Sequence, residues 1–325
     1  MSKGINVISL FDGISCGMIA LERAGIKVNN YYASEVDKHA IKVSKHNYPS
    51  IVHIGDVTKV FYSNGVLTTE NGVFNVGKFD LIIGGSPCQG FSMAGKQLAF
   101  DDPRSMLYFQ YERLKEETNA TYFLLENVKM KQEFKNLISQ RLGVESIAIN
   151  SNLVSAQNRY RLYWTNIKGV EQPKDEGILL EDIVMDVDEN YIRSGRLSWL
   201  KAYGEVKEKE GYVAFNPNKA KCLMVLPEPS WNTTYIVQYP HGSNGGGCRA
   251  LDGKTPAMTT SSWQYNNLLV KEGLVRKLSP EECEILQTVP VGYTAIVSES
   301  QRYKALGNGW TVDVIAHIFK KLKGD

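Results

Sequence analysis

The chain has 325 residues, which allows one large domain or two unequal ones. Hydrophobic residues make up 43 % and charged residues 22 %, a balance that excludes a disordered or fibrous protein. No apolar run approaches the roughly 20 residues of a membrane span, and the sequence opens without a signal-peptide pattern. The net charge of +2 neither indicates nor excludes a nucleic-acid partner, because binding to phosphates needs only a local basic face.

Five cysteines are scattered along the chain, and this odd number argues against a disulfide framework. We therefore expect a reducing, cytoplasmic location. We expect no metal site, because Cys222 and Cys248 lie far apart and neither His39 nor His46 has a partner at metal-ligand spacing.

Strand and helix signals alternate through the first half of the chain, a pattern that predicts a mostly parallel sheet. The expected strands are residues 5–11, 31–35, 52–54, 81–83, 122–125, 145–150 and 161–167. The expected helices are residues 15–24, 37–47 and 104–117. Two turn signals, Asn64-Gly65 and Asn71-Gly72, predict a small hairpin excursion between residues 60 and 79.

The alternation stops after about residue 170. Residues 190–270 are rich in Gly, Asn, Ser and Trp, which predicts a separate, irregular domain of β structure and loops. Helices are expected again at residues 280–287 and 310–322. Ser279 and Glu282 have the spacing of a capping box at the start of the first of these.

A cysteine follows the apolar strand expected at residues 81–83. That strand ends in Gly84-Gly85, and Ser86-Pro87-Cys88 comes next. Reactive groups in open α/β sheets lie just beyond the carboxyl ends of the strands. Cys88 is therefore either a nucleophile on a loop stiffened by a proline or a buried structural cysteine, and this segment alone does not decide between them.

The first three strand ends carry residues that suit a small ligand. Glycines at the first strand-to-helix turn, residues 10–17, allow close approach to the backbone, although their spacing is not that of a pyrophosphate site. Glu35 ends the second strand, where a carboxylate can accept from both hydroxyls of a ribose. Asp56 follows the third strand and could accept from an adenine amino group. Each residue could also be a simple turn or cap, but three at successive strand ends favour a ligand site.

Two further segments carry charged groups after apolar strands. Glu126 follows the fifth strand, where partial desolvation would suit its carboxyl group to donate a proton or a hydrogen bond. Arg159 and Arg161 are two residues apart, so on a strand their side chains would share a face and suit a phosphate or a carbonyl oxygen. A surface glutamate and a pair of surface salt bridges are the alternatives.

Taken together and in this order, these segments resemble the DNA cytosine-C5 methyltransferases that use S-adenosyl-L-methionine (AdoMet). The resemblance covers residues 5–167 and 275–320. The matching motifs are residues 11–17, Glu35, Asp56-Val57, 84–92, 102–107, 126–128, 157–161, 276–283 and 307–310. Two departures occur: Glu282 replaces an arginine of the ninth motif, and Gly309-Trp310 stands where Ser or Ala and then Val are commoner.

The resemblance implies a Rossmann-like AdoMet-dependent methyltransferase fold of the α/β class and a covalent mechanism. Cys88 would attack C6 of cytosine, Glu126 would hold N3 and the exocyclic amine, and Arg161 with Arg159 would hold the base carbonyl oxygen or a phosphate. The cofactor, which becomes S-adenosyl-L-homocysteine, would contact Phe11, Asp12, Gly13, Ser15, Gly17, Glu35, Asp56, Val57, Ser86, Pro87, Leu107 and Asn308.

The resemblance also implies double-stranded DNA as the substrate, with the target cytosine flipped out of the helix. Residues 1–185 would form the catalytic domain, with 275–325 returning to it or bridging, and residues 186–274 would form the target-recognition domain. The residues expected to contact DNA are Gln89, Ser92, Lys96, Arg104, Asn244 and Arg249. The loop of residues 90–104 would close over the flipped base.

The compact size indicates a monomeric bacterial or phage enzyme, cytoplasmic and associated with the nucleoid. It would serve restriction-modification, orphan methylation or protection of phage DNA, without physical need of a cognate endonuclease. One alternative is the tRNA-acting branch of the same fold, whose Cys-Phe-Thr signature is missing here. The other is a non-catalytic DNA-binding regulator, which should have lost Cys88, Glu126 or the cofactor loop.

Overall fold

The structure is a computed structural model. It describes residues 4–86, 106–185, 205–209, 212–216, 234–238, 247–249, 253–260, 267–271 and 274–324. The chain forms two compact units. The first comprises Met1–Asn150, Tyr160–Lys174 and Gly309–Asp325, and the second comprises Ser151–Arg159 and Asp175–Asn308. The end of the chain therefore belongs to the first unit.

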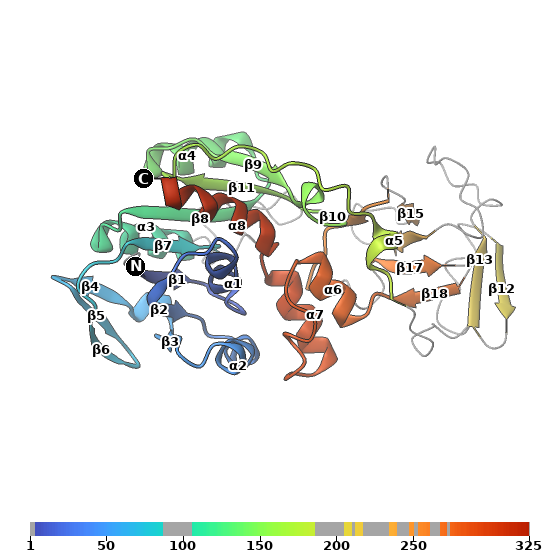
Figure 1. The fold of residues 1–325 in the computed structure, drawn as a ribbon, viewed down its shortest axis with the longest axis horizontal. Coiled ribbons are helices and arrows are strands. Elements are labelled where there is room, and N and C mark those ends of the chain that lie inside the picture. The colour runs from blue at the N-terminus through green and yellow to red at the C-terminus, as the bar shows by residue number, and fades with distance from the viewer. Residues whose placement is uncertain are drawn as a thin grey trace. The chain divides into compact units, whose positions relative to one another are not determined.

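The first unit is built on a seven-stranded sheet with the order β3-β2-β1-β7-β8-β11-β9 (Figure 1). Its first five strands pair in parallel, and β11 runs antiparallel to both of its neighbours. The strands are β1 (Ile5–Leu10), β2 (Val28–Ser34), β3 (Val52–His53), β7 (Leu81–Gly84), β8 (Tyr122–Val128), β9 (Ile147–Asn150) and β11 (Tyr160–Thr165). The mostly parallel sheet predicted from the sequence is confirmed.

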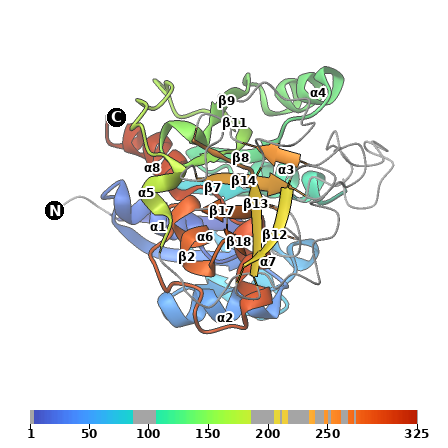
Figure 2. The same cartoon turned by 90° about the vertical axis from the view of Figure 1, so that its right-hand side faces the viewer.

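Helices cover both faces of this sheet, since its central strands are apolar on both sides. α1 (Cys16–Arg23) and α8 (Val312–Phe319) pack together on one face, and α3 (Met106–Thr118) and α4 (Gln132–Leu142) lie on the other (Figures 1 and 2). α2 (Lys38–Asn47) follows β2, with Asp37 accepting from backbone N–H groups at its start. The alternation of signals did not predict α4.

The segment after β3 forms a three-stranded antiparallel sheet where the sequence predicted a small hairpin. Its strands are β4 (Phe61–Ser63), β5 (Val66–Thr69) and β6 (Gly72–Asn75), preceded by the short helix η1 (Val57–Lys59). Asn64 and Gly65 join the first two strands with φ angles of 50° and 83°, the left-handed pair that a tight hairpin turn requires. The first predicted turn is confirmed, and the second lies one residue earlier than predicted, at Glu70-Asn71. Two turns produce three strands.

The second unit contains a six-stranded antiparallel sheet with the order β12-β13-β18-β17-β14-β15. Its strands are β12 (Glu205–Lys209), β13 (Tyr212–Asn216), β14 (Tyr235–Gln238), β15 (Gly247–Arg249), β17 (Leu268–Lys271) and β18 (Leu274–Lys277). A short parallel pair joins β10 (Gln157–Asn158) to β16 (Thr255–Pro256). The helices are α5 (Leu180–Ile183), α6 (Pro280–Leu286) and α7 (Glu299–Asn308), and short 3-10 turns are η3 (Ser151–Leu153) and, in the first unit, η7 (Lys320–Gly324). This unit has the β-rich character expected from its composition.

A buried ion pair fixes the start of α6. Ser279 and Glu282 form the predicted capping box, and Glu282 also accepts from the Arg276 guanidinium at 2.6 and 2.8 Å. The two charged side chains are only 2 % and 0 % exposed. Glu282, which departs from the resembled motif, therefore has a local reason: it caps a helix and neutralises a buried arginine.

We predict that Glu282→Ala lowers the free energy of unfolding by about 3–5 kcal/mol, because it leaves the Arg276 charge buried without a partner. Urea denaturation at pH 7 measures the loss. Glu281→Ala is the matched control, since its 2.7 Å pair with Arg302 is partly exposed and is expected to contribute less than about 1 kcal/mol. Equal losses for the two variants would contradict this account of α6.

Candidate active site

The parallel strands place one group of polar residues at a single edge of the first sheet. The carboxyl ends of β1, β2, β3, β7 and β8 share that edge, because these strands run in the same direction. The strands β1, β2, β3 and β7 are followed within three residues by Asp12, Glu35, Asp56 and Ser86, and Glu126 lies within β8, two residues before its end.

The loop after β1 has an unusual backbone. Phe11, Gly13 and Ser15 have φ angles of 57°, 61° and 62°. Such angles are uncommon for residues other than glycine, so neighbouring contacts must hold the loop in this form. A Cβ atom placed on Gly13 would meet no heavy atom within 4 Å. The backbone at Gly13 is therefore open to a ligand.

The Asp12 carboxylate stabilises this loop through hydrogen bonds. It accepts hydrogen bonds from the Ser15 hydroxyl at 2.5 Å and from the Tyr31 hydroxyl at 2.7 Å. The Ser15 hydroxyl also lies 2.6 Å from the Ser44 hydroxyl. Burial raises the pKa of Asp12 to about 6, against the lowering effect of its hydrogen bonds. The side chains of Asp12 and Ser15 therefore support the loop that the sequence assigned to the cofactor.

Glu35 connects the first two strand ends. One of its carboxylate oxygens accepts from the Gly13 N–H, and the other accepts from the N–H groups of Val36 and Asp37, all at 2.8 Å. These three donors fix the direction of the carboxylate before any ligand arrives. Because the carboxylate is hydrogen-bonded to the backbone of Gly13, a substitution at Glu35 or a displacement of the Gly13 backbone should alter the position of the other residue.

Asp56 and Val57 form the corresponding turn after β3. The Asp56 carboxylate accepts from the backbone and the hydroxyl of Thr58 at 2.9 Å and so caps η1. Val57 is buried in the core. The sequence allowed Asp56 to be either a cap or part of a ligand site. The structure shows the cap, and these hydrogen bonds also hold the carboxylate near the end of β3.

The groups at these three strand ends fit an adenosine-containing cofactor. The open backbone at Gly13, the fixed carboxylate of Glu35 and the carboxylate of Asp56 are the types of group that accept ribose hydroxyls and an adenine amine. Gly17 lies in α1, where a Cβ would come within 2.4 Å of Ile83 and 2.8 Å of the Tyr31 hydroxyl. Glycine is therefore required there for close packing of α1 on the sheet.

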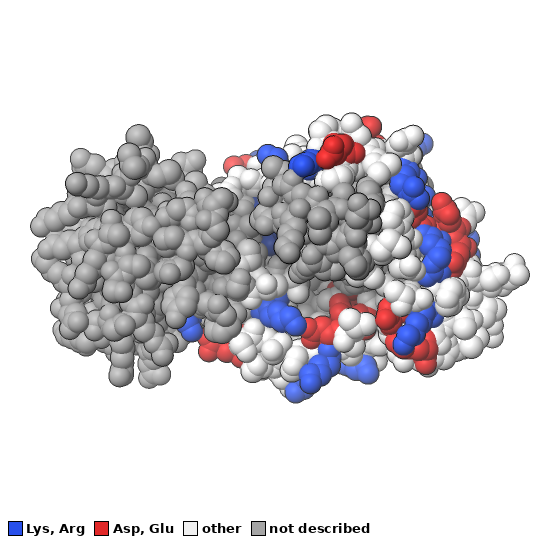
Figure 3. Space-filling view, turned by 180° about the vertical axis from the view of Figure 1, so that it is seen from behind, with Lys and Arg blue, Asp and Glu red and all other residues white. Residues whose placement is uncertain are grey.

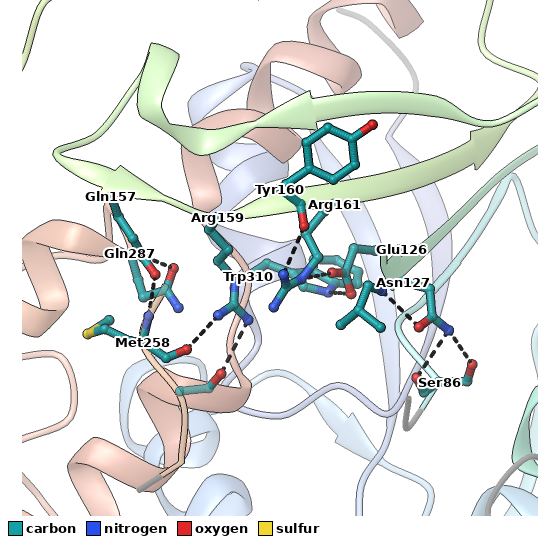
Figure 4. A network of polar contacts seen from close by, with 12 residues as sticks. Ser86, Glu126, Asn127, Gln157, Arg159, Tyr160, Arg161, Met258, Gln287 and Trp310 are labelled. Atoms are coloured by element: carbon teal, nitrogen blue, oxygen red, sulfur yellow. Dashed lines mark hydrogen bonds and ion pairs between the residues drawn. The ribbon is translucent and has the colours of Figure 1, made fainter. Parts of the chain in front are cut away.

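Glu126 is the centre of a second cluster at the same edge. One carboxylate oxygen lies 2.8 Å from Nε of Arg161, and the other accepts from the Trp310 indole N–H at 3.1 Å (Figure 4). Glu126 is 9 % exposed, so the expected desolvation is confirmed. Arg161 also donates to the Tyr160 carbonyl. Two donors from distant parts of the chain thus hold one buried carboxylate.

Asn127 connects this cluster to the strand end that leads to the cysteine loop. Its side-chain amide donates to the Ser86 hydroxyl at 3.2 Å and lies 3.5 Å from the Ser86 carbonyl oxygen. Ser86 is buried. The remaining predicted residues of that loop lie outside the described residues, namely Pro87, Cys88, Gln89, Ser92, Lys96 and Arg104.

The two arginines of the predicted pair have different surroundings. They do not share one strand, since β10 ends at Asn158 and β11 begins at Tyr160. Arg159 lies between the strands and donates to the carbonyls of Met258 at 2.9 Å and Gly307 at 3.2 Å (Figure 4). It is 5 % exposed. Arg159 thus donates to backbone carbonyls, whereas Arg161 is paired with Glu126.

The other predicted site residues are dispersed. Leu107 lies in the first turn of α3 and packs against the hydrophobic core. Asn308 is the exposed last residue of α7. Arg249 lies in β15, and Asn244 falls outside the described residues.

Sequence reasoning missed two residues of these clusters. Tyr31 was assigned only to a strand, although its hydroxyl bonds the buried Asp12. Trp310 was noted as the start of an expected helix and as a departure from the resembled tenth motif, and that departure was the available signal. No comparable signal marks Tyr31, because tyrosine is an ordinary strand residue.

The family model for C-5 cytosine-specific DNA methylases matches residues 5–324. The chain belongs to this family. Its members transfer methyl groups to DNA cytosine, and the relatives that align over nearly the whole chain are named type II methyltransferases. The DNA substrate and the AdoMet dependence implied by the sequence resemblance are thus features of the family to which the chain belongs.

Three bacterial relatives align over nearly the whole chain. Type II methyltransferase M1.ScrFI of Lactococcus lactis subsp. cremoris is 28 % identical, and the alignment covers 97 % of this chain and 77 % of the relative. M.NlaX of Neisseria lactamica is 27 % identical over 98 % and 96 % of the two chains. M.HpaII of Haemophilus parainfluenzae is 27 % identical over 97 % and 88 %.

Two solved structures share the fold. The methyltransferase EhMeth of Entamoeba histolytica has a TM-score of 0.64 at 18 % identity and covers 100 % of this chain and 99 % of its own. A DNMT2 variant of Spodoptera frugiperda has a TM-score of 0.62 at 19 % identity, with 98 % and 100 % coverage. At these identities the likeness concerns the fold alone.

The described residues show neither a broad patch of one charge on the face in Figure 3 nor a group of metal ligands. On the face in Figure 3, basic and acidic side chains are interspersed over the described residues, without a broad patch of one sign. Among the described residues, no three His, Cys, Asp or Glu side chains group as metal ligands would. No helix in the described part of the chain has the length and apolar character of a membrane span.

The raised pKa of Asp12 should make the free energy of unfolding depend on pH. Its pKa is raised from 3.8 to about 6, so the folded protein binds this proton more tightly than the unfolded chain. Ionisation therefore lowers the free energy of unfolding as the pH rises from about 4 to about 6, by about 3 kcal/mol in total. We predict that Asp12→Asn removes this loss, so that its stability relative to wild type rises by about 3 kcal/mol between pH 4 and pH 7. Denaturation curves across this range measure the difference, and a constant difference would contradict the assignment.

We predict that substitutions of the two arginines separate stability from activity. Arg159→Met should lower the free energy of unfolding by about 3 kcal/mol, because two carbonyls lose their donors. Arg161→Met should lower the methylation rate at least about 100-fold, since it removes a partner of Glu126. Denaturation and methylation assays on both variants at 25 °C test this. A rate loss in Arg159→Met as large as that in Arg161→Met, with the protein folded, would contradict it.

Proposed function

We propose that this member of the family methylates C5 of a cytosine that is flipped out of duplex DNA, at a specific sequence, through a covalent bond to Cys88. The buried Glu126 cluster carries the proposal, because a carboxylate held by an arginine at 2.8 Å suits recognition of the cytosine ring. The order of the motifs around Cys88 supports Cys88 as the nucleophile.

Cys88 would act as a thiolate that adds to C6 of the cytosine. A bond between sulfur and C6 makes C5 electron-rich, which overcomes the low reactivity of the aromatic ring. C5 would take the methyl group, which leaves the AdoMet sulfur with the electron pair of the broken bond. Loss of the C5 proton and elimination of the Cys88 thiolate would then restore the ring. Each bond formed to the protein is thereby broken, and the enzyme is regenerated.

Glu126 would hold the edge of the ring while charge builds on it. Its carboxyl group can contact N3 and the exocyclic amine, and supply a proton or a strong hydrogen bond at N3. Arg161 holds Glu126 and could also reach the base carbonyl oxygen or a neighbouring phosphate. Asn127 fixes the Ser86 end of the strand that leads to Cys88.

The cofactor would bind along the first three strand ends. AdoMet, when bound, supplies a methyl group attached to a positively charged sulfur. Glu35 would accept from the ribose hydroxyls, Asp56 would accept from the adenine amine, and the backbone at Gly13 would face the ligand. Asp12 and Ser15 would act by holding the loop, as their hydrogen bonds indicate.

Target recognition would belong to residues 186–274, with the methyltransferase acting as a monomer on DNA and without a bound endonuclease. The six-stranded sheet supports this division, because it belongs to a unit separate from the Glu126 cluster. The names of the bacterial relatives favour a restriction-modification role, and orphan or phage-protective methylation are the other uses of the same reaction.

We predict that duplex DNA, and not tRNA, accepts label from tritiated AdoMet in the presence of this protein. Cys88→Ser should abolish labelling, because serine is a far weaker nucleophile. DNA with 5-fluorocytosine at the target should trap a covalent adduct, since fluorine blocks loss of the C5 substituent. Bisulfite sequencing of plasmid from expressing cells identifies the target site.

Glu126→Gln separates the role of the carboxyl group from its effect on folding, because glutamine keeps the shape of the side chain and removes its ionisable group. It should bind DNA and be at least about 100-fold slower in methyl transfer. Labelling of tRNA instead of DNA, or full activity of Cys88→Ser, would refute the proposed reaction.

A further inference from the structure

Trp310 makes a contact that the sequence motifs do not assign to it. Its indole N–H donates to the Glu126 carboxylate at 3.1 Å, across 184 positions of the chain (Figure 4). The other carboxylate oxygen is paired with Arg161 at 2.8 Å. Each oxygen of Glu126 therefore has its own donor, and the two donors come from β11 and from the segment just before α8.

The backbone is shaped to permit this contact. Gly85, directly after β7, approaches both partners so closely that a Cβ atom there would lie 2.9 Å from the Glu126 oxygen and 2.9 Å from the indole nitrogen. Cβ atoms do not tolerate contacts this short. The absence of a side chain at Gly85 therefore leaves the space in which Trp310 reaches Glu126.

The chemistry of the contact concerns orientation. A carboxylate on a rotatable side chain must point in one direction to meet two neighbouring atoms of a base edge, and a small misplacement is costly to the rate. An indole can donate but cannot accept. It therefore holds the carboxylate without competing for the hydrogens of an exocyclic amine.

We propose that Trp310 is a positioning residue for cytosine methylation: its indole N–H, together with the Arg161 guanidinium, fixes the orientation of the Glu126 carboxylate. This role rests on the proposed function of Glu126. A valine, the commoner residue at this position in the resembled motif, has no donor and could not perform it.

Trp310→Phe tests the role, because phenylalanine keeps an aromatic ring and removes the N–H. Single-turnover methylation of duplex DNA should slow about tenfold, the usual effect of one hydrogen bond to a charged group. AdoMet binding, followed by calorimetry, should change less than about twofold, as expected for a change confined to the Glu126 cluster.

Trp164→Phe is the matched control. Trp164 belongs to the same unit, is fully buried and donates its indole N–H to the Ser139 hydroxyl at 3.0 Å. Its substitution removes the same group without touching Glu126, so the methylation rate of the folded variant should match wild type. Benzothienylalanine at position 310, which replaces the N–H by sulfur, guards against a packing defect and should behave as Trp310→Phe does.

A spectroscopic measurement tests the contact without relying on activity. In protein with nitrogen-15 tryptophan, Glu126→Gln should shift the Trp310 indole resonance and leave that of Trp164 in place. A wild-type methylation rate in both Trp310 variants, or an unshifted Trp310 resonance, would overturn the role alone. A wild-type protein that labels no DNA would overturn the proposed function and the role together.

Discussion

The parallel alignment of five strands is the constraint on which the site depends. β3, β2, β1, β7 and β8 end at one edge, so residues more than 100 positions apart in the chain reach the same place without a long connection. The alignment alone does not orient side chains. Glu35 is oriented by three backbone N–H groups, Asp12 by two hydroxyls and Glu126 by a guanidinium and an indole. Each carboxylate at this edge is therefore fixed by contacts of its own.

The sequence predicted those features that depend on local pattern. Alternating strand and helix signals led to the central sheet, and the spacing of Ser279 and Glu282 led to the start of α6. Two Asn-Gly turns led to the excursion after β3. These features follow from hydrogen bonding and side-chain periodicity within a few residues, so a single sequence contains them. The catalytic assignments needed the ordered motifs as well, since no short pattern identifies Glu126.

The sequence could not show which atoms meet. Arg159 and Arg161 are equivalent by spacing, yet one bonds the carbonyls of Met258 and Gly307 while the other bonds Glu126. The break between β10 and β11 separates them, and it depends on pairing with strands far along the chain. Asp12 is similar, because burial raises its pKa and one of its hydrogen-bond donors, Tyr31, comes from the neighbouring strand. Long-range packing decided these outcomes.

The return of the chain's end to the first unit has a consequence for the chemistry. α8 packs on α1, which follows the loop after β1, and one residue separates Trp310 from the start of α8. The helix therefore anchors the backbone from which the indole reaches Glu126. Its buried face, with Val312, Ile315 and Phe319, stabilises that anchor by removing apolar surface from water. A change that loosens α8 should consequently affect the orientation of Glu126 before it affects the parallel sheet, whose strands are held by their own hydrogen bonds.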